Sequence, residues 1–194
     1  VHSCDFIGPS SISLEIKNII PQNIDSNIPN INNPYTVTDK ADGLRKLLYI
    51  SNIGKIYFID TNMNVQFTGS ATKHKNSMNT IIDGEHVLHD KEGKFINLYL
   101  CFDIYYKNKK NMKGFPFYKV DPLNYINEDI EKDIFRLEEL QSFLKSLDNK
   151  CVIRNFKSEL SIRQKTFYTN IDNDMFSQCK IIIDGENDGT MFEY

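Results

Sequence analysis

The chain has 194 residues, of which 40% are hydrophobic and 25% are charged, and its formal net charge is −3. This length allows one sizeable hydrophobic core, so we expect a globular domain. The slight excess of acidic residues excludes an overall basic surface. Any polynucleotide would therefore have to bind in a local groove.

The cysteines, the apolar stretches and the first residues of the chain indicate where in the cell the protein is expected. The four cysteines lie far apart, at Cys4, Cys101, Cys151 and Cys179. No CxxC spacing occurs among them, which argues against a zinc cluster or a dense disulfide framework and favours reduced thiols in an intracellular protein. The longest apolar stretches are too short for a bilayer, and polar residues follow Val1 closely, so we expect no membrane contact and no signal peptide. A chain that starts at Val1 is expected to be a fragment of a larger protein.

Short strands dominate the pattern along the first half of the chain. A helix is expected at residues 14–20 and a loop at residues 21–34, where Asn, Pro and Ser are frequent. Tyr35 and Val37 alternate with threonines and indicate a first strand. Five more strands are expected at residues 44–51, 55–60, 65–69, 80–88 and 95–106, with a tight hairpin at residues 90–93. Such a meander needs a covering layer on its apolar face.

The second half of the chain contains the clearest helical pattern, at residues 127–147. Its apolar side chains recur at intervals of three and four, at Ile130, Ile134, Leu137, Leu140, Phe143, Leu144 and Leu147. We interpret this stripe as core packing. A shorter helix is expected at residues 172–178, and the basic run at residues 107–114 is expected to be a solvated loop. If that run faces a nucleotide, it can also hold phosphates or RNA.

Residues 40–45, which read Lys-Ala-Asp-Gly-Leu-Arg, carry the strongest chemical signal. An amine at the end of a strand can point into a cleft, where partial desolvation beside other cations lowers its pKa and makes it a nucleophile for phosphorus. Asp42 and Arg45 would then orient a sugar and its phosphates. The same residues also suit a plain hairpin turn, because Asp-Gly is a common turn dipeptide and flanking charges mark a wet surface.

Four segments in the same order resemble the motifs of covalent nucleotidyltransferases, the superfamily of messenger RNA guanylyltransferases and polynucleotide ligases. Their KxDGxR motif matches residues 40–45 without a gap. An acidic strand motif matches Asp83-Gly84-Glu85, an aromatic-plus-acid strand matches Phe102-Asp103, and the capping form DGLIF resembles residues 188–192 with two substitutions. The opening residues 6–15 resemble the entry to this domain in the capping enzymes of large DNA viruses.

The resemblance implies a role for each matched residue. Lys40 would attack the α-phosphate of GTP and form a lysyl-GMP adduct, which is then passed to the diphosphate end of RNA. The nucleotide-binding residues would be Asp42, Gly43, Arg45, Glu85 and Phe102, with Phe102 stacked on the guanine. Asp188 and Glu85 would hold Mg²⁺ or Mn²⁺, since such ions prefer oxygen ligands.

Each of these roles has a structural alternative. Phe102 can simply be buried in the core. A second Ile-Asp-Gly-Glu occurs at residues 183–186; we assign the acidic motif to the first copy, which precedes the Phe102 strand, and interpret the second as a turn leading into Asp188. His86 and His89 are expected to point to opposite faces of a strand, so that they do not share a metal.

The sequence thus predicts one nucleotide-binding domain over residues 1–194, of α+β class. Antiparallel twisted sheets with packed helices form an ATP-grasp-like ligase and capping fold. The last motif of this domain, with its two lysines, and the OB-fold lobe are not recognised in the chain. The leading function is an mRNA guanylyltransferase, with GTP and the 5′ end of RNA as partners and further capping modules in the same polypeptide or complex. If the source is a virus, the host cytoplasm or the virion is the expected location. An ATP-dependent DNA or RNA ligase and an inactive scaffold or binding module are the alternatives.

Overall fold

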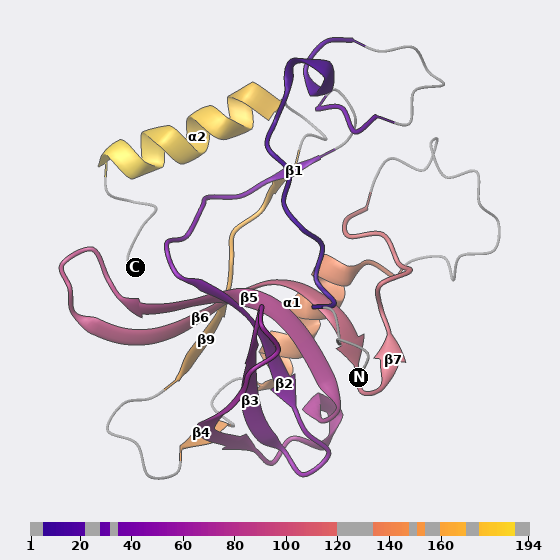
Figure 1. Ribbon diagram of the computed structural model, residues 1–194, viewed down its shortest axis with the longest axis vertical. Helices are drawn as coiled ribbons and strands as arrows, with labels where there is room; N and C mark the ends of the chain where they lie inside the picture. The colour runs from indigo at the N-terminus through magenta and orange to yellow at the C-terminus, as the bar shows by residue number, and fades with distance from the viewer. Residues whose placement is uncertain are drawn as a thin grey trace.

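The computed structural model describes residues 6–21, 28–31, 35–119, 134–147, 151–153, 160–169 and 175–188. Of residues 151–153, 169, 175–176 and 185–188 it describes the backbone alone. Within these ranges the protein is an α+β structure with two sheets and two α-helices (Figure 1). The predicted class is confirmed.

The larger sheet contains eight strands in the order β7-β6-β5-β2-β3-β4-β8, with β9 beside β6. Their bounds are β2 Leu44–Ile50, β3 Lys55–Asp60, β4 Val65–Thr72, β5 Thr80–His89, β6 Phe95–Lys107, β7 Lys110–Asn111, β8 Cys151–Ile153 and β9 Ser161–Gln164. All the pairings are antiparallel except the one between β6 and β9, which run in the same direction. The predicted strands are present, but the meander is correct only for β2-β3-β4 and for β5-β6, because β5 crosses back to pair with β2 and not with β4. The basic run lies at the β6–β7 hairpin.

One face of this sheet packs against helix α1, Arg136–Leu147, and forms the main core. Four stripe residues of the helix are buried: Leu137, Leu140, Phe143 and Leu147. They meet sheet residues such as Leu48, Ile50 and Ile82, each 0% exposed. The predicted core stripe is thus confirmed, although the described helix begins at Arg136 and residues 127–133 lie outside the described ranges.

A second, two-stranded sheet joins β1, Thr36–Val37, to β10, Tyr168–Thr169. Helix α2, Met175–Asp188, packs against both strands (Figure 1). This helix is longer than the predicted 172–178 and contains residues 183–186, so the predicted turn there is wrong. The expected helix at residues 14–20 is a short 3₁₀ helix, η1, Ile16–Asn18; a second, η2, spans Lys75–Ser77.

The strand period of two separates the faces of the larger sheet. On β2, Leu48 and Ile50 point into the α1 core, so Arg45, Leu47 and Tyr49 belong to the other face. That second face carries the candidate site. Among the described residues, none of the helices is long and apolar enough to cross a membrane.

Candidate functional site

Lys40 lies in the connection between β1 and β2, four residues before the β2 strand begins. Its Nζ is 3.0 Å from Oδ1 of Asp42, and the two side chains are 88% and 98% exposed. An ion pair this exposed contributes little to stability. The partial desolvation that the sequence predicted for this amine is absent from this structure, and the amine is open to an incoming reactant.

Gly43 allows this connection to pass close over β5. A Cβ at position 43 would lie 2.7 Å from the carbonyl oxygen of His86 and 2.9 Å from Cγ of Glu85. Since real Cβ atoms essentially never come that close to such atoms, any larger residue would push the connection away from the sheet. The glycine thus keeps the segment that bears Lys40 next to Glu85.

Arg45, one residue into β2, is held by the buried carboxylate of Asp83. Its Nε and Nη2 donate to the two oxygens of Asp83 at 3.2 and 2.6 Å, and its Nη1 donates to the carbonyl oxygen of Pro9 at 2.6 Å. The guanidinium also lies over the rings of Phe6 and Phe102, at 5.1 and 5.8 Å from their centres. Because planar bidentate pairing fixes both partners, Arg45 is preorganised for an anionic ligand.

Two bulges in β6 direct further side chains toward the Arg45–Asp83 pair. Asp83 pairs with Asp103 and Gly84 with Cys101, so Phe102 is an extra residue on β6; a second break in the register leaves Tyr105 extra in the same way. Such bulges redirect side chains. The Tyr105 hydroxyl donates to Oδ2 of Asp83 at 2.6 Å, and burial followed by the charge of Asp83 raises the pKa of Tyr105. Tyr105 therefore stays protonated and keeps donating.

Glu85 is the cross-strand partner of Arg45 and has an altered pKa. Burial raises the pKa of its carboxyl group, while the charges of Lys165, Lys40 and Arg45 oppose this shift. Among the residues that the structure describes, no hydrogen bond to the Glu85 carboxylate is found. The group is thus half-buried beside three cations and available to a ligand.

Lys165 is a component of the site that sequence reasoning missed. It follows β9, is 6% exposed, and its Nζ donates to the backbone carbonyl of Asp39, next to Lys40. Burial lowers the pKa of Lys165, the carboxylates of Asp39 and Glu85 oppose this, and Lys40 lowers it further. No spacing in the sequence distinguishes this lysine, because it reaches the site only through the parallel pairing of β9 with β6.

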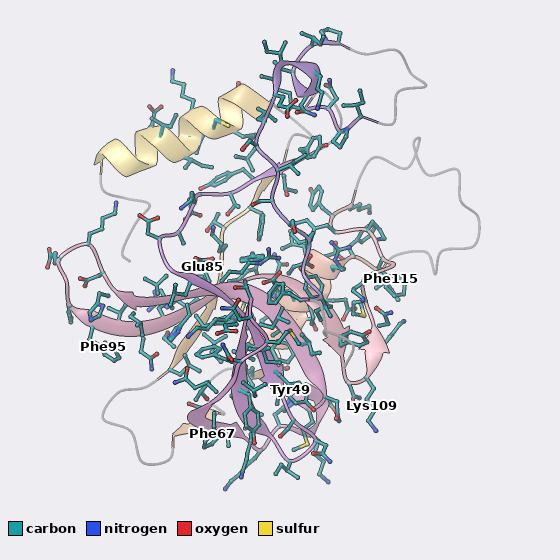
Figure 2. The ribbon with its side chains drawn as sticks, viewed as in Figure 1. Tyr49, Phe67, Glu85, Phe95, Lys109 and Phe115 are labelled. Carbon is teal, nitrogen blue, oxygen red and sulfur yellow. The ribbon has the colours of Figure 1, made fainter. Side chains whose placement is uncertain are left out.

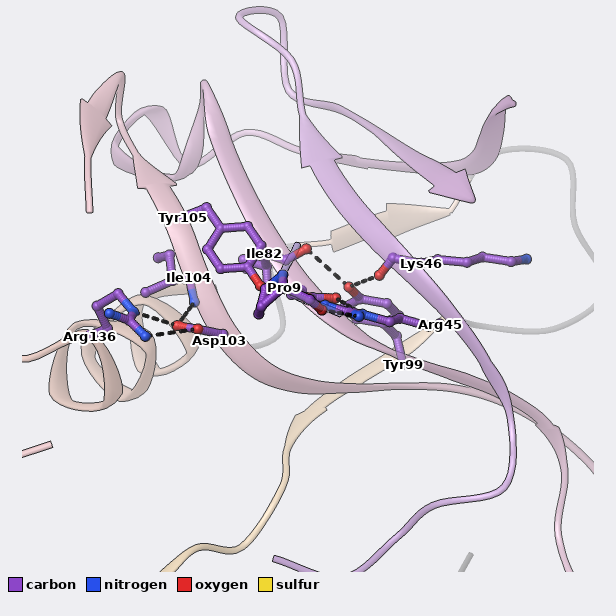
Figure 3. Close-up of polar contacts among 10 residues, drawn as sticks. Pro9, Arg45, Lys46, Ile82, Tyr99, Asp103, Ile104, Tyr105 and Arg136 are labelled. Carbon is purple, nitrogen blue, oxygen red and sulfur yellow. Dashed lines mark hydrogen bonds and ion pairs between the residues drawn. The ribbon is translucent and has the colours of Figure 1, made fainter. Parts of the chain in front are cut away.

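Of the remaining predicted residues within the described part, only Phe102 is found beside Arg45. Phe102 is half-buried beside Arg45 and is not among the buried core residues. Asp188 ends helix α2, and its side chain lies outside the described part. Asp103, from the same predicted motif as Phe102, forms a bidentate pair with Arg136 at 2.8 and 3.1 Å (Figure 3), which anchors the start of α1.

A metal centre built from protein side chains alone is not found among the described residues, which contain no group of three or more His, Cys, Asp or Glu placed to hold an ion. His86 is buried, with its Nδ1 3.1 Å from Lys46 Nζ and its Nε2 2.9 Å from Asn97 Oδ1. His89 is exposed beside Phe95. The predicted separation of the two histidines is confirmed.

Comparison with known proteins gives two results. A family model described as "mRNA capping enzyme, catalytic domain" matches residues 3–193. The chain is also 28% identical over 180 residues to a "Probable mRNA-capping enzyme" of Acanthamoeba polyphaga mimivirus, covering 88% of this chain and 15% of that protein. The chain thus spans about 15% of the length of this relative.

Proposed function

The chain belongs to the family of mRNA capping enzyme catalytic domains, and on that premise we propose that it transfers GMP from GTP through Lys40 to the 5′-diphosphate end of RNA. One observation carries the proposal at the level of residues. The exposed Lys40 follows Asp39, whose backbone carbonyl accepts from the buried Lys165, and Gly43 holds the same connection against Glu85 just before Arg45. A nucleophile and two fixed cations thus meet at one end of the sheet.

The first step forms the covalent adduct. Lys40 attacks as the free amine, having released a proton to Asp42 or to solvent. Its Nζ bonds to the α-phosphorus of GTP as the bond to pyrophosphate breaks, and the nitrogen gives up a second proton to pyrophosphate or solvent. In the second step an oxygen of the RNA terminal phosphate attacks the same phosphorus, and the N–P bond breaks. The Lys40 nitrogen takes up one proton as it leaves and a second from solvent, which restores the ammonium group.

Fixed positive charge supports both steps. Arg45 and Lys165 can meet the phosphate oxygens, where negative charge is redistributed as the bond to the leaving group breaks. Each is fixed by the protein before any ligand binds, Arg45 by Asp83 and Lys165 by the Asp39 carbonyl. Their orientation therefore needs no reorganisation during the reaction.

Phe102 is suited to the base of the nucleotide, and Glu85 is suited to a Mg²⁺ ion bound with its phosphates. The half-buried ring of Phe102 keeps part of its surface open, on which a purine can stack. Glu85 offers an oxygen ligand with no hydrogen bond to the described residues, which suits Mg²⁺, an ion bound through one or two carboxylates together with substrate phosphates. In that role the ion would neutralise phosphate charge. Asp188 is proposed as its second protein ligand.

The proposed activity is tested by incubating the full-length protein with Mg²⁺ and GTP that carries a radiolabel on the α-phosphate. We expect a label that survives denaturing gel electrophoresis, and none with labelled ATP. Lys40→Ala should abolish the label and Lys40→Arg should do the same, because arginine keeps the charge but is not a nucleophile. Lys91→Ala, a change in the β5–β6 hairpin, is the matched control and should label normally.

The other outcomes assign the chain differently. Label from ATP and none from GTP would identify a ligase-type adenylation domain. Label from neither nucleotide would identify an inactive member of the family. A label that persists in both Lys40 variants would remove Lys40 from its role, whichever nucleotide is used.

A further inference from the structure

A row of aromatic side chains crosses five adjacent strands on the site face of the larger sheet. Residues directly opposite each other on antiparallel strands share a face. The register places one such line across β4, β3, β2, β5 and β6, through Phe67, Tyr57, Tyr49, Ile81 and Tyr106. We call the four rings, with Ile81 between them, the aromatic row.

Three rings of the aromatic row, Tyr49, Tyr57 and Phe67, pack side by side and keep part of their surface exposed. Tyr49 and Tyr57 are stacked with centres 6.4 Å apart, and Tyr57 and Phe67 are 5.4 Å apart. Phe67 is 40% exposed and the three tyrosines are half-buried. The α1 core lies on the other face, so these rings are not needed to cover it. Neighbouring, partly exposed rings on the face of a sheet are the kind of platform on which RNA-binding sheets stack bases.

The charges around the aromatic row favour a polyanion. Lys55 lies over the ring of Phe67 and Lys113 over the ring of Tyr106, each at 5.7 Å from the ring centre. Two acids lie on the same face of β5. Asp83 is 0% exposed and paired with Arg45, and Glu85 lies farther along the strand, opposite Arg45. A cation at each end of an aromatic line matches single-stranded nucleic acid, whose phosphates flank stacked bases.

The row also has a suitable position relative to the nucleophile. Tyr49 and Arg45 lie on one strand and one face, four residues apart, which is roughly 13 Å along β2. In Figure 2, Tyr49 and Phe67 lie in the lower part of the sheet, and Glu85 lies above them toward β1. Leu47, between Arg45 and Tyr49, is 2% exposed, so the row is a surface separate from the nucleotide site.

We propose that the aromatic row binds the single-stranded 5′ segment of the RNA acceptor, with bases stacked on Tyr49, Tyr57 and Phe67, and so delivers the RNA end toward Lys40. The delivery rests on the proposed guanylyltransferase function; the binding of RNA does not. Because formation of the lysyl-GMP adduct needs no RNA, the row should affect only the second half of the reaction.

The test measures two quantities in the full-length protein. The first is the affinity for a fluorescent single-stranded RNA of about 12 nucleotides, read by anisotropy without GTP. The second is labelling by GTP without RNA. Phe67→Leu and Tyr57→Leu keep an apolar side chain but remove the ring, and each should weaken RNA binding by roughly five- to 100-fold, the range of one stacking contact. GTP labelling should be unchanged.

Two controls separate stacking from general effects. Tyr57→Phe keeps the ring and should bind RNA like the wild type. Phe95→Leu changes a phenylalanine that is 49% exposed but lies at the β5–β6 hairpin, away from the row, and should also bind normally. An affinity within twofold of wild type in both Phe67→Leu and Tyr57→Leu would overturn the proposal, and so would an equal loss in Phe95→Leu.

The remaining outcomes are equally decisive. Unchanged RNA affinity together with a changed elution volume of the row variants would assign the row to a protein interface and overturn the proposal. Absence of GTP labelling in the wild type would refute the proposed function, while the anisotropy measurement would still decide whether the row binds RNA.

Discussion

The pentapeptide Ile-Ile-Asp-Gly-Glu occurs twice in this chain, at residues 81–85 and 182–186, and folds in two different ways. The first copy lies in strand β5 and the second in helix α2. Asp83 is 0% exposed, whereas Asp184 is exposed. The same five residues therefore determine neither their secondary structure nor the burial of their aspartate.

The neighbours of each copy account for the difference. Strand β5 lies between β2 and β6, so both edges of the first copy are hydrogen-bonded to a partner strand. The second copy satisfies its backbone groups within the helix, with Ile182 8% exposed and Ile183 54% exposed. Tertiary pairing thus supports the strand preference of the β-branched residues in the first copy. It also supplies Asp83 with Arg45 and Tyr105, partners that make it part of a site.

The largest difference between the two copies is expected when the buried carboxylate of Asp83 is removed. Asp83→Asn takes away the carboxylate that Arg45 pairs with, and loss of one partner of a buried ion pair destabilises a protein by about 3–5 kcal/mol. We expect about 3 kcal/mol, because the Arg45 side chain is 26% exposed and water compensates in part. Asp184→Asn should change the free energy of unfolding by less than about 0.5 kcal/mol. Urea denaturation measures both, and equal effects would contradict the assignment.

The next largest effect concerns activity. Glu85→Gln removes a charged group from among Lys40, Arg45 and Lys165, and we expect GTP labelling to slow by about 100-fold, as for loss of one preorganised polar group. Asp184→Asn, in the helical copy, should label at the wild-type rate. The rate of adduct formation in single-turnover experiments is the measurement. A Glu85→Gln rate within a few-fold of wild type would exclude Glu85 from the site.

Replacing the glycine of each copy by alanine sharpens the comparison, because the two changes in the free energy of unfolding should have opposite signs. A Cβ at position 84 would lie 2.5 Å from Cζ of Tyr99 and 2.6 Å from the carbonyl oxygen of Leu100. Gly84→Ala should therefore destabilise the protein by about 2 kcal/mol through overpacking. Gly185 lies inside helix α2, where Gly→Ala stabilises by about 0.5–1 kcal/mol. Thermal unfolding should show a lowered midpoint in the first variant and a raised one in the second.

The smallest effect is a pH dependence of stability. Burial raises the pKa of Glu85 in the folded protein above its ordinary value of 4.5. As pH rises from 4.5 through the folded-state pKa, the unfolded chain releases this proton first, so the free energy of unfolding falls across that window. Solvent screening of the partly exposed carboxylate limits the fall to less than about 1 kcal/mol. Denaturation between pH 4 and 7 should show it in wild type, and Glu85→Gln should lack it.

Much of the fold follows from patterns along the chain. The strands at residues 44–51, 55–60 and 80–88 were predicted within a residue or so, because β-branched and aromatic runs end at clear turn residues. The α1 stripe was predicted because its apolar residues recur at helical spacing. The α2 copy of the pentapeptide was predicted wrongly as a turn, since Asp-Gly also occurs in turns and nothing local reveals the helix around it.

The residues of the site also divide into those that the sequence predicts and those that only the structure reveals. Arg45, Glu85 and Phe102 were identified because they lie within recognisable motifs, and the structure brings these three together on one face of the sheet. Lys40 was also identified from its motif, but its exposed position was not expected. Asp83 as the partner of Arg45 was not predicted, because this pair depends on the register between β2 and β5. Tyr105 as the donor to Asp83 was not predicted, because the bulges that redirect β6 leave no mark in the residue pattern.

By itself the sequence determined the strand segments, the core face of α1 and the set of motif residues, because these depend on periodicity and on residue type within a few positions. The tertiary structure alone decided that β5 pairs with β2, that Asp83 is buried against Arg45 and that Lys165 lies beside Lys40. The physical reason is that strand pairing joins residues far apart in the chain: Arg45 meets Asp83 across β2 and β5, and β9 brings Lys165 to Asp39 from 126 positions away.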